Sequence, residues 1–384
     1  MSRTACSDIR KAQKETHMKK TKGRGRKVLI IVLAVLAASG IGIFAMMRMV
    51  MKSIGAGSGS VADADKRVII WEMPAGSSSR SKLDDMNIRS ENGNLMLATV
   101  DFAKAIVNAD YEDAEQTIDT FTYLYEIKTG YEKETYDDQP YLIPYPAEQS
   151  KGAVIVIPGG GFGYKSMDGT TGEGKDIAEE LNKAGYTAFV LHYRSNPYEY
   201  PIPYLDVQRA VRFIRYHASD YGFNPDCIGL IGFSAGGNEI GGFINLVMGK
   251  DLFPEDYVPD EIDAVDDSVR APAMIYPALS FNYNVPMLFC MFDDEQVRDD
   301  AKRQELLNLM DLKLHLNTDM KNQFVSYGTA DNMVGMDESK AYIKAARDAG
   351  IDVVEVAAEG KNHGYTFENY GAEYLQWLNA VFSE

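Results

Sequence analysis

The chain has 384 residues, of which 45% are hydrophobic and 25% are charged, a composition typical of a globular protein with a sizeable core. Its net charge of −17 is divided unevenly, because the first 60 residues carry 12 Lys and Arg against 2 Asp and Glu, while the remainder carry 27 against 54. Such an acidic body argues against nucleic-acid binding, which depends on basic side chains, and three cysteines without a C-x-x-C pair do not suggest a disulfide framework or a zinc ribbon.

The N-terminal part of the sequence is predicted to anchor the protein in a membrane. Residues 28–47 are twenty uncharged residues, which as a helix would rise roughly 30 Å and match the core of a bilayer. Ten Lys and Arg lie before this run, in residues 1–27, so the positive-inside rule keeps that basic segment in the cytoplasm and the rest outside. We expect a signal anchor over 28–50 in the cell membrane; a cleaved signal peptide, the alternative, would have a shorter apolar core.

Two segments separate the anchor from the main body of the chain. Residues 51–66 have the composition of a flexible linker. Residues 67–138 are predicted to form a small helical extension, because apolar residues recur three and four positions apart over 97–110 and 112–130. The second of these helices should end at Gly130.

From residue 139 onward, short apolar runs alternate with amphipathic helical stretches. The runs cover 153–157, 187–194, 227–234, 272–279, 323–330 and 352–359, and the clearest helical stretches cover 175–185, 204–222 and 339–350. Strands that are almost continuously hydrophobic indicate a parallel sheet covered on both faces, so we expect an α/β domain over 139–384. Its longest connection contains either a lid over 281–321 or an ordinary helix with a long loop.

A glycine-rich stretch, PGGGFGYKS, follows the first of these strands at 158–166 and favours binding an oxyanion over a phosphate. A phosphate-binding loop needs glycine directly before lysine, but Tyr164 stands between Gly163 and Lys165. The dinucleotide pattern G-x-G-x-x-G also fails, because its last position falls on Tyr164 or Ser166. Glycines let backbone amides approach a reacting oxygen closely.

The pentapeptide at 232–236, Gly-Phe-Ser-Ala-Gly, matches the nucleophile elbow G-x-S-x-G. An apolar strand precedes it and a helical stretch follows, which is the context that lifts the Ser234 hydroxyl into the open. The alternative is a glycine-rich turn with an ordinary serine. An elbow serine needs amide donors for the oxyanion, and we expect them from Gly160, Gly161 and Ala235.

A nucleophilic serine also needs a base and an acid that orients the base, and in this fold they follow it in the order acid, then histidine. Asp331 lies just past one strand and His363 just past the next, so we assign them these roles. Asp337, Glu338 and Glu359 are rival acids that do not directly follow a strand in a glycine-introduced turn. The remaining histidines do not fit the required position or order; they are His17, His192, His217 and His315.

From about residue 139 to its end the chain resembles α/β-hydrolases of the serine esterase type, similar to bacterial acetyl esterases and acetyl-xylan esterase-like proteins. The resemblance is carried by PGGGF at 158–162, GFSAGG at 232–237, GTADNMV around Asp331 and GKNHGY around His363. It implies an α/β-hydrolase fold with an eight-stranded sheet, the triad Ser234-Asp331-His363, and hydrolysis of short acyl esters without a metal or another cofactor. Pro158 and Asn238 stand where many relatives carry histidine, which loosens the substrate assignment.

We therefore expect a membrane-anchored, extracytoplasmic serine carboxylesterase that hydrolyses short acyl esters, chiefly acetyl groups, on small molecules or carbohydrates. Phe162 and Tyr164 are candidate substrate contacts. Two alternatives stay open: a propeller-free serine peptidase of the prolyl-oligopeptidase type, and a catalytically silent surface binding protein built on a hydrolase scaffold. We expect no nucleic-acid partner.

Overall fold

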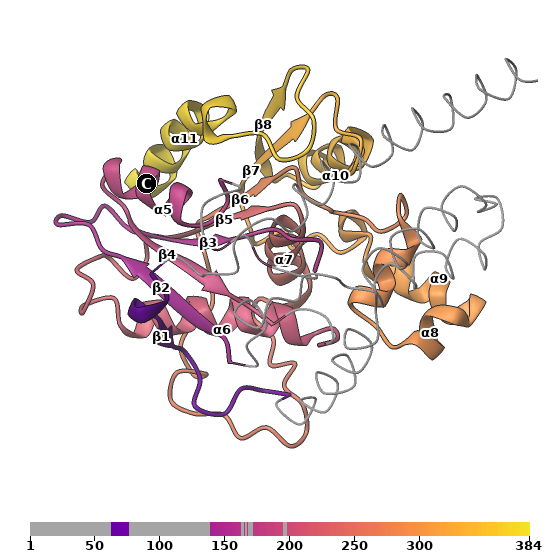
Figure 1. Cartoon of the computed structure of the whole chain (residues 1–384), viewed down its shortest axis with the longest axis horizontal. Coiled ribbons are helices and arrows are strands. Elements are labelled where there is room, and N and C mark those ends of the chain that lie inside the picture. The colour runs from indigo at the N-terminus through magenta and orange to yellow at the C-terminus, as the bar shows by residue number, and fades with distance from the viewer. Residues whose placement is uncertain (1–62, 77–138, 163–164, 166, 168–171, 195–197) are drawn as a thin grey trace, which may run out of the picture. The chain divides into compact units, whose positions relative to one another are not determined.

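Eight strands in the described part of the chain form one sheet, in the order β1-β2-β4-β3-β5-β6-β7-β8. The computed structural model describes residues 63–76, 139–162, 165, 167, 172–194 and 198–384 (Figure 1). The expected basic segment, the anchor, most of the linker and residues 77–138 of the helical extension lie outside them. Within the described ranges no helix combines the length and apolar character needed to cross a bilayer.

The six strands from β4 to the β8 edge of the sheet run parallel to their neighbours, while β1 and β2 are antiparallel additions at the other edge. The parallel strands match the six apolar runs in the sequence. The strand bounds are β1 (Val68–Ile69), β2 (Tyr141–Tyr145), β3 (Ala153–Ile157), β4 (Thr187–His192), β5 (Ile228–Phe233), β6 (Ala271–Ile275), β7 (Asn322–Gly328) and β8 (Asp352–Ala358). The predicted mostly parallel sheet is confirmed.

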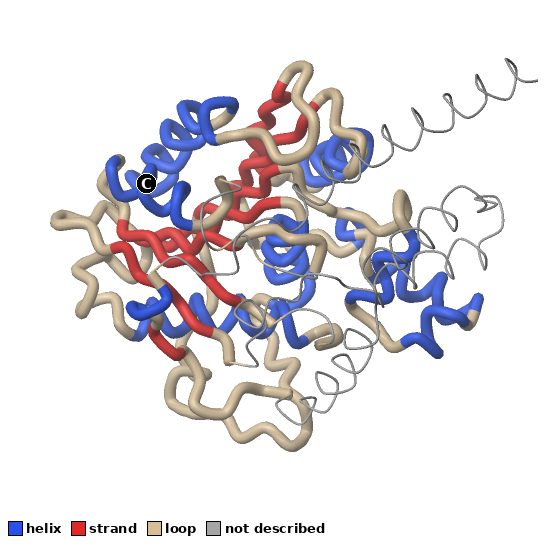
Figure 2. The backbone as a smooth tube through the Cα atoms, viewed as in Figure 1, coloured by secondary structure: helices blue, strands red, loops and turns tan. Residues whose placement is uncertain are grey.

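Two hydrophobic cores lie on opposite faces of this sheet, because alternate residues of each strand point to opposite sides. Ile155 of β3 belongs to the first core, which α6 (Ile202–Tyr216), α7 (Ala235–Gly242) and α10 (Met336–Asp348) cover. Its neighbour Val156 belongs to the second, which α5 (Lys175–Lys183) and α11 (Gly371–Ser383) cover. Figure 2 shows these helices on both sides of the strands. Burial on both faces explains why the strands read as continuous apolar runs.

The long connection between β6 and β7 is largely helical. It contains α8 (Asp294–Arg298) and α9 (Asp300–Leu309), with short 3₁₀ turns at Val285–Cys290 and Leu312–Leu314. Val297, Met310 and Leu312 are fully buried in the first core, so the connection is packed onto the domain. That it moves as a lid over 281–321 stays a prediction.

Residues 63–76, here called the N-terminal strap, belong to the hydrolase fold and not to a separate extension. The strap holds a 3₁₀ turn (Ala64–Lys66) and β1, in which Val68 pairs with Leu142 of β2. For residues 63–76, the predictions of a flexible linker up to residue 66 and of a helical extension from residue 67 are therefore wrong. A two-residue strand has no periodicity that sequence analysis could detect, and its position depends on pairing with a strand some seventy residues away.

The strap is fixed to the domain mainly through Trp71, which is buried. Its indole Nε1 donates to the hydroxyl of Tyr257 at 2.6 Å, and its ring faces the guanidinium groups of Arg194 and Arg209 at 5.7 and 5.3 Å. The same two arginines donate to strap carbonyls, Arg194 to Ala75 and Arg209 to Ile70. These contacts make the strap part of the packed core.

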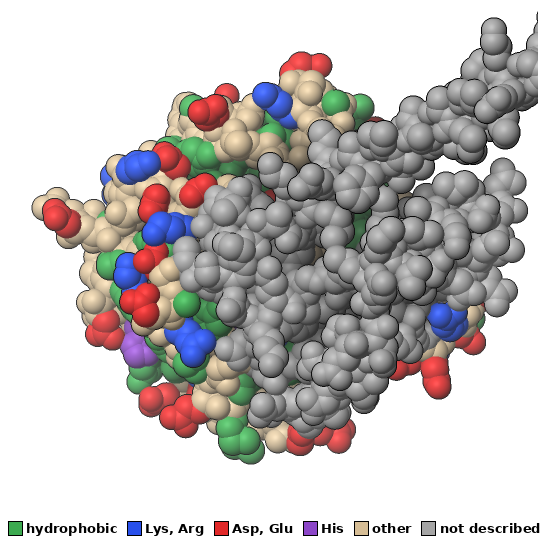
Figure 3. All heavy atoms as spheres, viewed as in Figure 1, with side chains coloured by type: hydrophobic (Ala, Val, Ile, Leu, Met, Phe, Trp, Pro, Cys, Tyr) green, Lys and Arg blue, Asp and Glu red, His purple; other side chains and the backbone are tan. Residues whose placement is uncertain are grey.

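The charges on the described surface are mixed. Figure 3 shows acidic and basic side chains interspersed on the visible face, without a broad basic patch among the coloured atoms.

We predict that Trp71→Ala destabilises the domain by about 3–5 kcal/mol, because a buried aromatic side chain and its contacts are lost together. Met73→Ala, three-quarters exposed on the same strap, should change the unfolding free energy by less than about 0.5 kcal/mol. Urea unfolding of both variants tests this. A loss of stability in Trp71→Ala as small as that expected for Met73→Ala would contradict the role assigned to Trp71.

Candidate active site

Ser234 occupies a sharp turn between β5 and α7. Its backbone is left-handed, with φ 52° and ψ −113°, a conformation that costs a non-glycine residue about 1–3 kcal/mol. The turn is held by three backbone hydrogen bonds. The Ser234 N–H donates to the carbonyl of Ile275, and the carbonyl of Ser234 accepts from the N–H groups of Asn238 and Ala278. The strained turn is what the nucleophile-elbow motif predicts.

The two glycines of the motif are required by close backbone contacts. A Cβ on Gly232 would lie 2.3 Å from the carbonyl oxygen of Gly236, and a Cβ on Gly236 would lie 2.1 Å from the carbonyl oxygen of Ile157. Neither backbone oxygen can move aside as a flexible side chain could. Glycine is therefore needed at both ends of G-x-S-x-G, because the start of α7 packs directly against the backbone of β3 and β5.

The structure brings Ser234, His363 and Asp331 together in one chain of hydrogen bonds. His363 Nε2 lies 2.8 Å from Ser234 Oγ, and His363 Nδ1 lies 2.8 Å from Asp331 Oδ2. The Asp331 side chain is 1% exposed and that of His363 is 12% exposed, so the imidazole connects a buried carboxylate to the serine hydroxyl. With Nδ1 protonated toward the carboxylate, Nε2 is free to accept the hydroxyl proton.

Asp331 is oriented by the backbone that follows it. Its Oδ1 accepts hydrogen bonds from the N–H groups of Met333 and Val334, both at 2.9 Å. These bonds leave Oδ2 for His363. An aspartate that bonds to the backbone two and three residues ahead stabilises a turn of this kind, which explains why it follows β7 directly.

Asn362 joins the loop that carries the aspartate to the loop that carries the histidine, and the sequence analysis missed it. Its Oδ1 accepts from the N–H of Asn332 at 3.0 Å and from the N–H of His363 at 2.8 Å. Gly328 keeps the loops close, since a Cβ there would lie 2.4 Å from the carbonyl oxygen of Lys361. The only feature of the sequence that could have pointed to Asn362 is its position directly before His363.

The rival residues lie elsewhere. Asp337 and Glu338 are in the first turn of α10, and Glu359 is exposed just after β8. Among the other histidines, His192 stacks on Tyr141, His217 contacts Asp220, and His315 contacts the carbonyl of Asn308. His17 lies outside the described residues.

The glycine-rich loop lies against the serine. Gly160, Gly161 and Phe162 all have positive φ, and a Cβ on the preceding Gly159 would lie 3.1 Å from the Cβ of Ser234. The hydroxyl of Tyr193 donates to the carbonyl of Pro158 at 3.0 Å, which fixes the start of the loop. Ala235 is the first residue of α7, where backbone N–H groups lack a partner within the helix.

Of the two candidate substrate contacts, Phe162 and Tyr164, the structure describes only Phe162. Phe162 is fully buried and packs edge-to-face on Phe281, with ring centroids 5.7 Å apart, which favours a packing role. Tyr164 lies outside the described residues. Tyr276, which sequence analysis did not select, packs against the imidazole of His363 at 4.9 Å between ring centroids.

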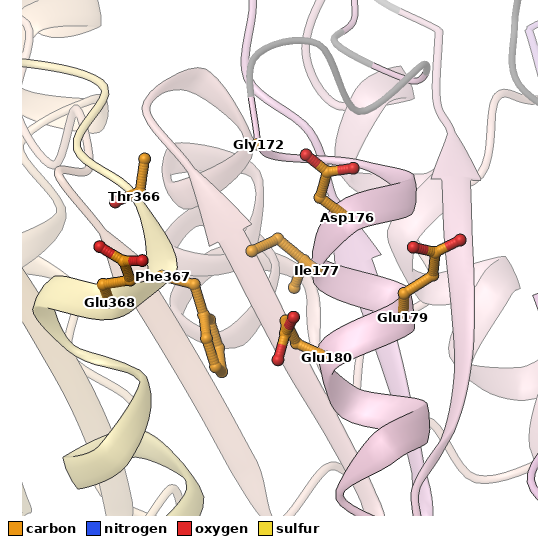
Figure 4. Close-up of a pocket in the computed structure, with 8 residues that line it drawn as sticks. All are labelled: Gly172, Asp176, Ile177, Glu179, Glu180, Thr366, Phe367 and Glu368. Carbon is orange, nitrogen blue, oxygen red and sulfur yellow. The ribbon is translucent and has the colours of Figure 1, made fainter.

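Another pocket lies between α5 and the segment before α11 (Figure 4). Its lining includes four carboxylates; the lining residues are Gly172, Asp176, Ile177, Glu179, Glu180, Thr366, Phe367 and Glu368. None of the candidate site residues lines it.

We predict that Gly236→Ala destabilises the domain by about 3 kcal/mol, because the new methyl group overlaps a backbone oxygen. Gly335 precedes α10 with a negative φ and open space around it, so Gly335→Ala should change stability by less than about 0.5 kcal/mol. Denaturant midpoints of the two variants provide the comparison. A Gly236→Ala protein as stable as wild type would contradict this account of the elbow.

Comparison with known proteins agrees with this architecture. The BD-FAE family model matches residues 141–250. An acetylxylan esterase from Xylanibacter ruminicola is 39% identical over 93 residues, which are 24% of this chain and 19% of the relative. The probable carboxylic ester hydrolase LipM of Mycobacterium tuberculosis is 24% identical over 211 residues, which are 53% of this chain and 47% of the relative.

Among solved structures, an acetyl ester-xyloside bifunctional hydrolase from Caldicellulosiruptor lactoaceticus matches with a TM-score of 0.52 at 23% identity, covering 64% of this chain and 86% of that chain. The chain spans less than half the length of the curated relatives it matches. It has the α/β-hydrolase fold, and the resemblance to acetylxylan esterases and carboxylesterases predicted from its motifs is confirmed.

Proposed function

We propose that this protein is a serine carboxylic ester hydrolase that acts through Ser234, His363 and Asp331. The observation that carries the proposal is the pair of 2.8 Å contacts that His363 makes, one to the serine hydroxyl and one to the buried aspartate. Similarity to named acetylxylan and carboxylic ester hydrolases supports it.

In this mechanism His363 Nε2 takes the proton of Ser234 as Oγ attacks the acyl carbon. Asp331 keeps the imidazole in the required tautomer and stabilises its positive charge. His363 then gives the proton to the leaving alcohol, and the acyl-enzyme forms. Water attacks that intermediate with His363 again as base, which releases the acid and restores Ser234.

The oxyanion that forms at each step needs fixed donors. We assign this role to the backbone N–H groups of Gly160, Gly161 and Ala235. The left-handed backbone of the two glycines and the position of Ala235 at the start of α7 support the assignment. Loss of one such donor typically costs about 10²- to 10³-fold in rate.

For the substrate we propose short acyl esters, with acetyl groups on carbohydrates as the leading class. The support is the printed names of relatives, an acetylxylan esterase and an acetyl ester-xyloside hydrolase, and neither name fixes the substrate of this chain. Acetylated xylo-oligosaccharides and aryl esters of increasing acyl length are therefore the substrates to compare.

We predict that a fluorophosphonate probe labels the wild-type protein and that Ser234→Ala abolishes both labelling and ester hydrolysis. Asp331→Asn should lower kcat by about 10⁴-fold, because an amide can still accept from Met333 and Val334 but favours the wrong tautomer of His363. Asp337→Asn changes a nearby exposed acid and should leave kcat unchanged. Mass spectrometry detects the labelled protein, and the rate of acetate release measures ester hydrolysis.

Folded wild-type protein that is neither labelled nor active on any acetyl or butyryl ester would contradict the proposal and favour a silent binding protein. Labelling together with cleavage of peptides but not of esters would favour the peptidase alternative. Faster deacetylation of xylo-oligosaccharides than of aryl acetates supports the carbohydrate assignment, and the reverse order contradicts it.

We also propose that residues 28–50 anchor the protein in the cell membrane with the hydrolase on the extracytoplasmic side. The uncharged run at 28–47 and the ten basic residues before it support this. Val35→Arg with Leu36→Arg should release the protein from carbonate-washed membranes, since each arginine costs about 2.5–3.5 kcal/mol at the centre of a spanning helix. Ser58→Arg with Ser60→Arg, in the linker, should not. Retention of the first variant, or protease protection of the hydrolase in spheroplasts, contradicts the proposal.

A further inference from the structure

Glu173, just before α5, is a buried carboxylate that contacts two parts of the candidate active site. It is 7% exposed. Its Oε2 accepts a hydrogen bond from the backbone N–H of Gly159 at 3.0 Å, and its Oε1 accepts one from the hydroxyl of Tyr276 at 2.9 Å. Burying a carboxylate is costly unless hydrogen bonds compensate it, and here each of its two oxygens accepts one.

The first contact fixes the glycine-rich loop at its start. Gly159 is packed against the elbow, since a Cβ there would lie 2.6 Å from the carbonyl oxygen of Phe233. Because a peptide unit is planar, a bond to the Gly159 N–H fixes the plane of the Pro158–Gly159 peptide unit, directly before the Gly160 and Gly161 amides. Without the carboxylate, the Gly159 N–H loses a charge-assisted bond in a buried place.

The second contact holds the aromatic residue beside the base. Tyr276 follows β6 in a left-handed conformation with φ 38°, and its ring meets the His363 ring edge-to-face at 4.9 Å. Burial raises the pKa of Tyr276 well above its usual range, and the charge of Glu173 raises it further. The hydroxyl therefore stays protonated and donates to Glu173, which fixes the ring that limits movement of the imidazole.

We propose that Glu173 is a positioning residue that holds the oxyanion loop and the support of His363 in one arrangement around Ser234. This inference rests on the proposed function. Glu173, which is not one of the three proposed catalytic residues, would thus keep the oxyanion donors and His363 correctly placed relative to Ser234. Displacement of such groups by about 1 Å is enough to cost roughly 10²-fold in rate.

Four variants test the role by separating positioning from stability. Glu173→Ala removes both contacts, and Tyr276→Phe removes one. Glu173→Gln keeps both, because its amide oxygen can accept from Gly159 and its NH₂ can donate to the Tyr276 oxygen. Asp267→Ala is the matched control: Asp267 is also buried and accepts from a backbone N–H, that of Gly249, and from Gln208, remote from the site.

We expect Glu173→Ala to lower kcat for p-nitrophenyl acetate by about 10- to 100-fold with KM changed less than about 3-fold, and Tyr276→Phe to lower kcat by a smaller factor. Glu173→Gln should stay within about 5-fold of wild type. Hydrogen exchange over residues 158–162 should become faster in Glu173→Ala. Asp267→Ala should lower the melting temperature while kcat and exchange at 158–162 remain as in wild type.

The outcomes separate this inference from the proposed function. If wild type hydrolyses esters and Glu173→Ala keeps its kcat, the positioning role is overturned and the esterase function stands. It is also overturned if Asp267→Ala loses kcat as much as Glu173→Ala does, because the loss would then report stability alone. If wild type hydrolyses no ester, the proposed function fails first and this inference fails with it.

Discussion

The contact of one imidazole with both a serine and an aspartate depends on where parallel strands end. Ser234 follows β5, Asp331 follows β7 and His363 follows β8. Because these strands are parallel neighbours in the order β5-β6-β7-β8, their carboxyl ends meet at one edge of the sheet. The histidine loop has only to reach across the ends of β7 and β6 to meet the serine. Residues separated by 129 positions in sequence thus lie within hydrogen-bond distance.

The same edge explains why glycine recurs around the site. The elbow turns so tightly that side chains at Gly232 and Gly236 would overlap backbone oxygens, and the glycine-rich loop after β3 packs against that turn through Gly159. The left-handed conformations of Ser234 and Tyr276 belong to this region as well. Strained backbone is maintained only where the surroundings determine it fully, and here two cores and the hydrogen bonds of the loops do so.

The sequence predicted those features whose cause is local. Each parallel strand is buried on both faces and is therefore apolar throughout, and Ser234 lies in a motif whose spacing is set by sterics. The strap escaped prediction because a two-residue strand has no periodicity and Trp71 owes its burial to residues on α6 and beyond. Asn362 and Tyr276 escaped it for a related reason: their contacts depend on loops that only the sheet brings together.

Glu173 shows most clearly how such a role is hidden from sequence. Gly159 and Tyr276, two of its partners, lie 14 and 103 residues away, and an acidic residue between a glycine-rich loop and a helix would ordinarily be read as solvated. In the fold it is buried between the loop after β3 and the residue after β6, on either side of the strand that carries Ser234. A buried charge and a left-handed tyrosine both lower stability locally. Their occurrence together beside Ser234 and His363 places this local loss of stability where the loop after β3 and those two side chains are held in position.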